Sequence, residues 1–188
     1  MSKAEDIVLV GGSAGSYNLI VELIEALPTF FGQAIVVIIH RNPKFTTRLE
    51  DTLAARLHRP IIQAGDKTTI SKNMVYFAVP GYHLLIEPDR TFSLDISDPV
   101  QFSRPSIDVL FESGAEVYGK RCTALLLSGA NKDGTDGLTA VQKLGGQIMV
   151  QSPEDALIST MPESAIQAND DIAIVSDQQI ISYFRSLK

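Results

Sequence analysis

The chain has few of the residues on which disulfide-bonded and metal-binding proteins depend. Cys122 is the only cysteine among 188 residues, which excludes an internal disulfide and is typical of a reducing cytoplasm. Because this thiol lies in an apolar run, we expect it to be buried and inert. The three histidines have no acidic residues at ligand spacing, so we expect no metal and no other cofactor.

Long apolar runs are missing as well. No stretch approaches the ~20 apolar residues that cross a bilayer. Residues 1–6 are polar and lack the basic start and the apolar centre of a secretory signal. We therefore expect a cytoplasmic protein without stable insertion into a membrane.

Basic residues are fewer than acidic residues, which gives a formal net charge of −6, and the sequence has no basic stripe. This balance argues against nucleic acid as a partner. Hydrophobic residues make up 45% and charged residues 20% of the chain, as in ordinary soluble globular proteins. A chain of 188 residues suits one domain, 1–188, that buries roughly 70% of its unfolded surface. Neither a repeat nor a long linker divides it, and the sequence does not indicate an oligomeric state.

What the chain does contain is a regular alternation of apolar runs and amphipathic stretches. Several runs, such as 35–39 and 123–127, are apolar without interruption, which is typical of parallel strands covered on both faces. We expect an α/β fold with a doubly wound, mostly parallel sheet flanked by helices and an antiparallel hairpin at one edge, within 74–96. The expected strands are 7–11, 34–39, 61–62, 74–79, 122–127, 147–150 and 171–175, and the expected helices are 15–27, 46–57, 105–118, 134–144, 161–168 and 177–187.

The first apolar run stops on a Gly-x-Ser-x-Gly turn, residues 11–15. Ser13 then lies on a sharp bend between a strand and a helix, which presents a hydroxyl at the carboxyl edge of the sheet. Two other interpretations of this serine are a helix N-cap and a phosphate-binding turn. A dinucleotide site is disfavoured because Gly-x-Gly-x-x-Gly is not matched, and because His40 stands where such a site needs an acidic residue.

Two further loops bring suitable side chains to the same edge of the predicted sheet. His40 follows the second strand, and Asp133 lies in the loop after the strand at 122–127. A serine hydroxyl needs a base to remove its proton, and an imidazole base needs an acceptor on its other nitrogen. We therefore predict a triad of Ser13, His40 and Asp133. The alternatives are a hydrogen-bonded histidine at a strand end and an aspartate that caps the helix after it.

The oxyanion that develops during acyl transfer needs donors too. The backbone amide of Ala14, next to Ser13, and amides in the Gly129-Ala130 turn are candidates. Arg104 is a candidate for the edge of a substrate pocket. Its alternative role is plain helix initiation, because Pro105 then falls in the first turn, where proline is tolerated.

Taken together, these motifs resemble the catalytic domain of the bacterial chemotaxis protein-glutamate methylesterase family. The resemblance extends from about Ile7 to Asn169, with the motifs in the family's order. The turn at 11–16 matches the family's Gly-Ala-Ser-Thr-Gly-Gly in type. The other matching segments are Phe45-Thr46, Leu53–Leu57, Val75–Leu84, Arg104–Phe111, Ser128–Leu138 and Met161-Pro162.

The resemblance implies that Ser13 is the nucleophile, His40 the base and Asp133 the orienting acid, and that the amide of Ala130 helps to form an oxyanion hole. It also implies an enzyme that hydrolyses glutamate methyl esters on the cytoplasmic helices of methylated chemoreceptors, and that some members deamidate glutamine there. The chain departs from the family's His-Met-Pro at residues 40–43, and Ala130 replaces a methionine. These departures concern the pocket and its substrate more than the reaction.

Candidates for the wall of the substrate pocket are Gly12, Arg41, Arg104 and Met161. The basic residues that we expect to make the rim of the site locally positive are Arg41, Lys44, Arg48 and Lys132. The sequence shows no counterpart of the family's receiver domain, which leaves two interpretations, a free-standing protein and a fragment of a longer one. We expect a free-standing protein, because a methionine comes shortly before the first strand. Two other functions stay open: a serine esterase or amidase that acts on another protein, and a non-catalytic signalling module.

Overall fold

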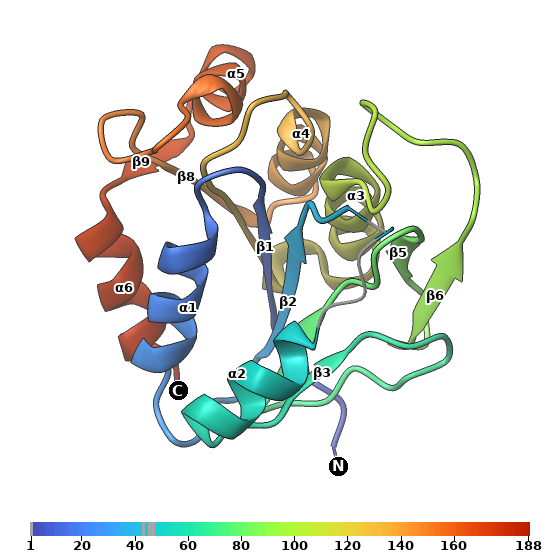
Figure 1. Ribbon diagram of the computed structural model, residues 1–188. Helices are drawn as coiled ribbons and strands as arrows, with labels where there is room; N and C mark the ends of the chain where they lie inside the picture. Colours follow the sequence, from blue (N-terminus) through green and yellow to red (C-terminus); the bar gives the residue numbers. More distant parts are fainter. Residues whose placement is uncertain (1, 43, 45–47) are drawn as a thin grey trace.

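Among the residues that the structure describes, which are 2–42, 44 and 48–188, seven parallel strands form one central sheet in this computed structural model (Figure 1). The strand order is β3-β4-β2-β1-β7-β8-β9. The strands of this sheet are β1 (Ile7–Gly12), β2 (Ala34–Ile39), β3 (Ile61–Gln63), β4 (Met74–Phe77), β7 (Cys122–Leu126), β8 (Gln147–Gln151) and β9 (Ala173–Val175). The helices are α1 (Tyr17–Ala26), α2 (Leu49–Leu57), α3 (Ile107–Tyr118), α4 (Thr135–Lys143), α5 (Thr160–Ala168) and α6 (Asp177–Ser186).

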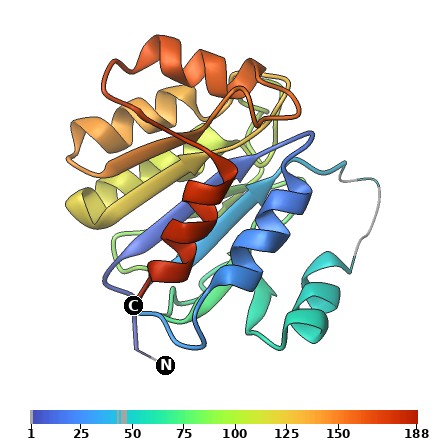
Figure 2. The same cartoon turned by 90° about the vertical axis from the view of Figure 1, so that its left-hand side faces the viewer.

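The two faces of the sheet are covered by different helices because successive side chains of a strand point to opposite sides. In β1, Ile7 and Leu9 belong to the core beneath α3, α4 and α5, whereas Val8 and Val10 belong to the core beneath α1, α2 and α6. Figure 2 shows α1 and α6 side by side across one face of the sheet. The uninterrupted apolar strands are thus buried on both sides, as the sequence predicts.

The antiparallel hairpin forms a sheet of its own. It consists of β5 (His83–Ile86) and β6 (Phe92–Asp95), and it packs against α3. The amide of Ile86 donates a hydrogen bond of 3.1 Å to the hydroxyl of Ser113 on α3, which fastens the hairpin to the helix. The preceding strand, β4, is part of the central sheet and pairs in parallel with β2.

The predicted fold class is confirmed, and the strands lie where the sequence places them within a residue or two at most ends. Two helices, α1 and α3, begin two residues later than predicted. The first begins at Tyr17 rather than 15 because a turn follows Ser13, and α3 begins at Ile107 rather than 105 because Ser106 is its N-cap in extended conformation. The predicted start of the second helix, at 46–47, lies outside the described residues.

The topology decides where a site can form. β1 lies inside the sheet, with β2 on one side and β7 on the other. The chain passes from β1 to one half of the sheet and later crosses to the other half, so the strand order reverses beside β1. Ligands of open α/β sheets bind at such a switch point, beyond the carboxyl ends of the strands.

Candidate active site

Ser13 is the first residue after β1 and begins a tight turn. The amide and the hydroxyl of Ser16 both donate to the carbonyl oxygen of Ser13, at 3.2 and 2.8 Å. Gly15 is the third residue of this turn and has φ +89°, the left-handed value that a type II turn requires there. The N-cap of α1 is Ser16, so the interpretation of Ser13 as a helix N-cap is wrong.

Small residues surround this turn because neighbouring parts of the fold press against it. A Cβ atom added at Gly12 would lie 2.5 Å from Oγ of Ser16. One added at Gly129 would lie 2.5 Å from Cε of Met161 and 3.0 Å from Cβ of Ser13. The glycines therefore allow the loop after β7 and the start of α5 to close around the serine.

His40 is the first residue after β2 and continues the pairing of β2 with β1. Its amide donates to the carbonyl oxygen of Gly12 at 3.2 Å, and Gly12 and Ile39 are the last register partners of the two strands. Ser13 and His40 are the next residues along the two strands, so the same register places them side by side. The parallel register thus brings together two residues that are 27 positions apart in the sequence.

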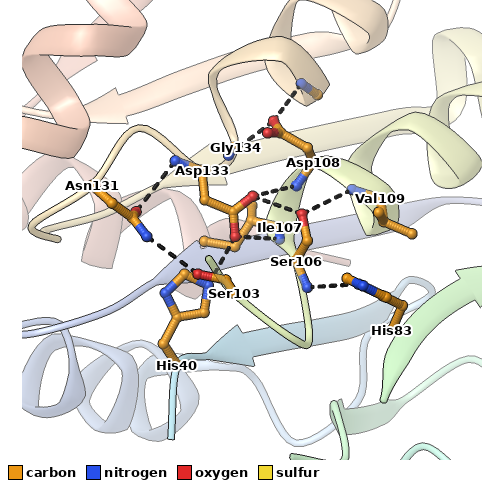
Figure 3. Close-up of polar contacts among 11 residues, drawn as sticks. His40, His83, Ser103, Ser106, Ile107, Asp108, Val109, Asn131, Asp133 and Gly134 are labelled. Atoms are coloured by element: carbon orange, nitrogen blue, oxygen red, sulfur yellow. Dashed lines mark hydrogen bonds and ion pairs between the residues drawn. The ribbon is translucent and has the colours of Figure 1, made fainter. Parts of the chain in front are cut away.

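Asp133 accepts four hydrogen bonds although its side chain is fully buried. Oδ2 lies 2.9 Å from Nε2 of His40 and accepts the amide of Ile107 at 2.9 Å (Figure 3). Oδ1 accepts the hydroxyl of Ser106 at 2.8 Å and the amide of Asp108 at 3.0 Å. The carboxylate therefore joins the histidine to the N-terminus of α3.

The alternative role that the sequence allows for Asp133, as the cap of the helix that follows it, is wrong. The N-cap of α4 is Gly134, with φ +98° and no side-chain hydrogen bond. Asp133 instead caps α3, the helix that precedes it in the chain. This cap, made by a residue distant in the sequence, holds the carboxylate where it meets His40.

Burial by itself would raise the pKa of Asp133. The hydrogen bonds from His40, from the amides of Asp108 and Ile107 and from the hydroxyl of Ser106 outweigh it, so the pKa of Asp133 is lowered from its usual value. The carboxylate stays ionised near neutral pH. An ionised acceptor fixes the orientation of the imidazole and stabilises its protonated form.

Asp108 caps α4 in return. Its Oδ1 accepts the amide of Gly134 at 2.9 Å and that of Gly137 at 2.8 Å. Burial, together with the charges of Asp133 and Asp136, raises the pKa of Asp108 to about 7. The two helix N-termini are thus locked to each other by two buried carboxylates, one of which is ionised only with difficulty.

Sequence reasoning missed three residues that support Asp133. Ser106 and Asp108 surround the start of α3, and Asn131 accepts the amide of Asp133 on Oδ1 at 3.2 Å (Figure 3). A serine two residues before an aspartate at a helix start indicates capping, but which helix the aspartate caps is decided by tertiary contact. His83, which is buried, accepts the amide of Ser106 on Nδ1 and so supports the same corner.

The structure joins two members of the predicted triad directly. His40 and Asp133 are hydrogen-bonded, and Ser13 is placed beside His40 by the strand register. Within the described part of the chain, the Ser13 hydroxyl makes no hydrogen bond to the imidazole. Nucleophile and base are often further apart in free enzymes and approach each other when substrate binds.

The two predicted oxyanion residues, Ala14 and Ala130, are both exposed next to Ser13 and Gly129. Neither amide donates a hydrogen bond to another residue that the structure describes. Two backbone donors are therefore available to a ligand at this place.

A cavity of about 390 Å³ opens beside His40. Of the four predicted pocket residues, Arg41 and Arg104 line it. Gly12 and Met161 are buried and lie behind the serine turn, because Gly12 belongs to β1 and Met161 packs under Gly129. The further residues that line this cavity are Asn42, Gly81, Pro99, Phe102 and Ser103.

The expected positive rim is only partly present. Arg41 donates to Glu50 at 2.6 Å, and Arg48 donates to Asp51 at 3.2 Å, so acidic neighbours from α2 balance both charges. Lys44 and Lys132 are exposed. Arg41 also donates to the carbonyl oxygen of Ala78, which fixes the cavity wall between β2 and β4.

None of the helices in the described ranges has the length and hydrophobicity that a membrane crossing needs. In the same part of the chain, the side chains of histidine, cysteine, aspartate and glutamate form no cluster of three that could hold a metal ion. Cys122 is fully buried in β7, as predicted.

Comparison with known proteins identifies clear relatives. The family described as "CheB methylesterase" matches residues 8–184. The "Putative protein-glutamate methylesterase/protein-glutamine glutaminase" of Leptospira interrogans is 41% identical over 95% of this chain and 93% of the relative. The "Protein-glutamate methylesterase/protein-glutamine glutaminase" of Trichodesmium erythraeum is 32% identical over 84% of this chain but only 46% of the relative. The crystal structure of the Thermotoga maritima CheB methylesterase catalytic domain superposes with a TM-score of 0.89 at 29% identity, over 98% of both chains.

Proposed function

The chain belongs to the CheB methylesterase family, and from this premise we propose that it hydrolyses methyl esters of glutamate side chains on chemoreceptor helices through a covalent intermediate on Ser13. A methylesterase is a hydrolase of carboxylic esters, and the names of the Leptospira and Trichodesmium proteins specify protein-bound glutamate. The observation that carries the mechanism is the hydrogen bond of 2.9 Å between His40 and the buried Asp133. The register of β1 and β2, whose last pair precedes Ser13 and His40, supports the place of the nucleophile next to this base.

The first half of the reaction transfers the acyl group to the enzyme. Nε2 of His40 is bonded to Asp133, so Nδ1 is the ring nitrogen left to accept the proton of Ser13. Oγ of Ser13 attacks the ester carbonyl, and its proton passes to His40. The amides of Ala14 and Ala130 stabilise the negative charge on the carbonyl oxygen. His40 then returns the proton to the methoxide as it leaves, which gives methanol and an acyl-serine.

The second half releases the product. His40 takes a proton from water, the hydroxide attacks the acyl-serine, and the proton goes back to Oγ of Ser13. The products are a free glutamate carboxylate and the regenerated enzyme. The same steps on a glutamine side chain release ammonia in place of methanol, and the glutaminase part of the relatives' names supports this second activity.

The test is methanol release from membranes that carry methylated chemoreceptors, together with labelling by a fluorophosphonate, which reacts with activated serines. We expect the wild type to release methanol and to be labelled at Ser13. Ser13→Ala should lose both, with a rate lower by about 10⁴- to 10⁶-fold and an unchanged circular dichroism spectrum.

A matched control is Ser182→Ala, which removes an exposed hydroxyl on α6 and should keep both signals. Labelling of the wild type without methanol release would favour an esterase or amidase with another protein target. Absence of both signals in the wild type would favour a non-catalytic signalling module.

A further inference from the structure

The loop between β6 and α3, residues 96–106, rises beside α3 on the right of Figure 1. Pro99, Phe102, Ser103 and Arg104 from this loop line the same cavity as His40. The proposed catalytic chemistry uses none of these four side chains. They form a wall beside the base rather than part of the proton relay.

The backbone at the tip of this loop is held in an unfavourable conformation. Val100 and Ser103 exchange backbone hydrogen bonds of 3.1 and 2.8 Å, which closes a hairpin turn with two central residues. The φ angles of these residues, Gln101 and Phe102, are +47° and +63°. Two positive φ values are typical of a type I′ turn, for which Asn-Gly is the favoured sequence. Glutamine and phenylalanine rarely adopt this conformation because of their Cβ atoms.

The side chain of Phe102 is fully exposed, with a relative accessibility of 101%. Single exposed apolar residues are common on protein surfaces. Here, however, an exposed aromatic ring coincides with a strained backbone at the mouth of the cavity. Neither feature stabilises the folded chain by itself, and strained residues of this kind gather at ligand clamps.

The turn is fastened firmly in this position. Nη1 of Arg104 donates to the carbonyl oxygens of Ile96 and Ser97 at 2.9 and 2.8 Å, which draws the two ends of the loop together. Nδ2 of Asn131 donates to the hydroxyl of Ser103 at 3.2 Å, and Asn131 also holds the amide of Asp133. The position of Phe102 is therefore tied to that of the triad.

We infer that Phe102 is a specificity-determining residue that packs on an apolar side chain next to the esterified glutamate of the substrate helix. The inference rests on the proposed function. Residues three and four positions apart share one face of a helix, about 5–6 Å from each other. A glutamate that inserts its ester beside His40 therefore brings such a neighbour against the cavity wall, where Phe102 stands. Burial of the aromatic ring then favours a polypeptide with an apolar neighbour at this distance.

The test uses two synthetic helical peptides, each with one glutamate methyl ester. They differ only in the residues three and four positions from the ester, which are leucine in one peptide and serine in the other. We expect the wild type to hydrolyse the leucine peptide with a kcat/KM about tenfold higher, as burial of part of one leucine implies. In Phe102→Ala the ratio of the two kcat/KM values should fall to about one.

Two more variants complete the design. Phe102→Gly should lose the preference equally, and its melting temperature should not fall below that of Phe102→Ala, because glycine accepts a positive φ. Phe30→Ala is the matched control. Phe30 is 65% exposed and precedes the amino end of β2, whereas His40 follows its carboxyl end. It should keep the wild-type preference.

The outcomes separate the inference from the proposed function. A preference that persists in Phe102→Ala, or that is absent from the wild type, overturns the inference and leaves the methylesterase function intact. If Phe102→Ala lowers kcat/KM equally on both peptides and leaves their ratio unchanged, Phe102 has a merely structural role, and this result also overturns the inference. A wild type that hydrolyses p-nitrophenyl acetate but neither peptide overturns the proposed function, and the inference falls with it.

Discussion

Replacement of Asp108 by asparagine separates the capping role of this side chain from its charge. Oδ1 of an asparagine at this position can still accept the amides of Gly134 and Gly137. The substitution removes a carboxylate that is only 4% exposed and lies close to the ionised Asp133. The local fold should therefore persist while one titrating group disappears.

The pKa values of Asp108 set the sign and the size of the effect. The pKa is 3.8, the ordinary value of an aspartate, in the unfolded chain, and folding raises it to about 7. Because folding raises this pKa, the unfolded chain ionises first, and the protein loses stability as the pH rises from 3.8 towards 7. These two values correspond to a loss of roughly 3 kcal/mol between pH 4 and pH 7, with little further change above pH 8.

Asp108→Asn lacks this titration. Its free energy of unfolding, relative to that of the wild type, should therefore rise by roughly 3 kcal/mol over the same pH range. Urea unfolding followed by circular dichroism at pH 4, 5, 6, 7 and 8 measures the difference. The slope with pH is the quantity of interest, because any effect of the amide group itself shifts all points equally.

Asp170→Asn, at an exposed position, is the control and should follow the wild-type curve. Parallel curves for Asp108→Asn and the wild type would refute the reasoning, since they would mean that folding does not disfavour the ionised form of Asp108. If such a parallel curve lies below that of the wild type, the constant offset measures lost capping. Asp108→Ala, which removes both accepted hydrogen bonds, gives the size of that loss.

Two further predictions follow from buried groups. Asp133→Asn should lower kcat for ester hydrolysis by about 10⁴-fold, because an amide in place of the carboxylate favours the wrong tautomer of His40; a loss below tenfold would contradict the assigned role. Cys122 should resist a thiol reagent in the folded protein at pH 8 and react fully in urea, because the thiol is fully buried and its burial raises its pKa to about 12. Rapid labelling of the folded protein would show that β7 opens readily.

The sequence predicted much of the fold because its signals are local. Each apolar run of the central sheet is bounded by turn residues, and the runs at 35–39 and 123–127 have no polar interruption, so strand type and parallel class follow from the pattern alone. The helix boundaries were less certain. The turn from Ser13 to Ser16 delays the start of α1. The hydrogen bonds that Ser16 donates to the carbonyl oxygen of Ser13 depend on the positive φ angle of Gly15.

The candidate site divides in the same way. Ser13 and His40 could be found from the sequence because each follows an apolar strand, and strand ends of a parallel sheet meet at one edge. The sequence also indicated Asp133. Its alternative role, as a helix cap, was assigned to α4, whereas Asp133 caps α3. Which helix N-terminus a buried carboxylate reaches depends on the packing of α3 against α4, and local sequence carries no information about that packing.

By itself the sequence determined the order of strands and helices, the residue types at the sheet edge and the absence of an internal disulfide. Only the tertiary structure decided that Asp133 caps α3 and Asp108 caps α4, and that a strained turn brings Phe102 to the cavity that His40 also lines. The physical reason is the distance along the sequence over which the interactions act. Strand and helix formation depends on neighbours a few positions away, whereas a buried carboxylate or a cavity wall is defined by segments that meet only when the chain has folded.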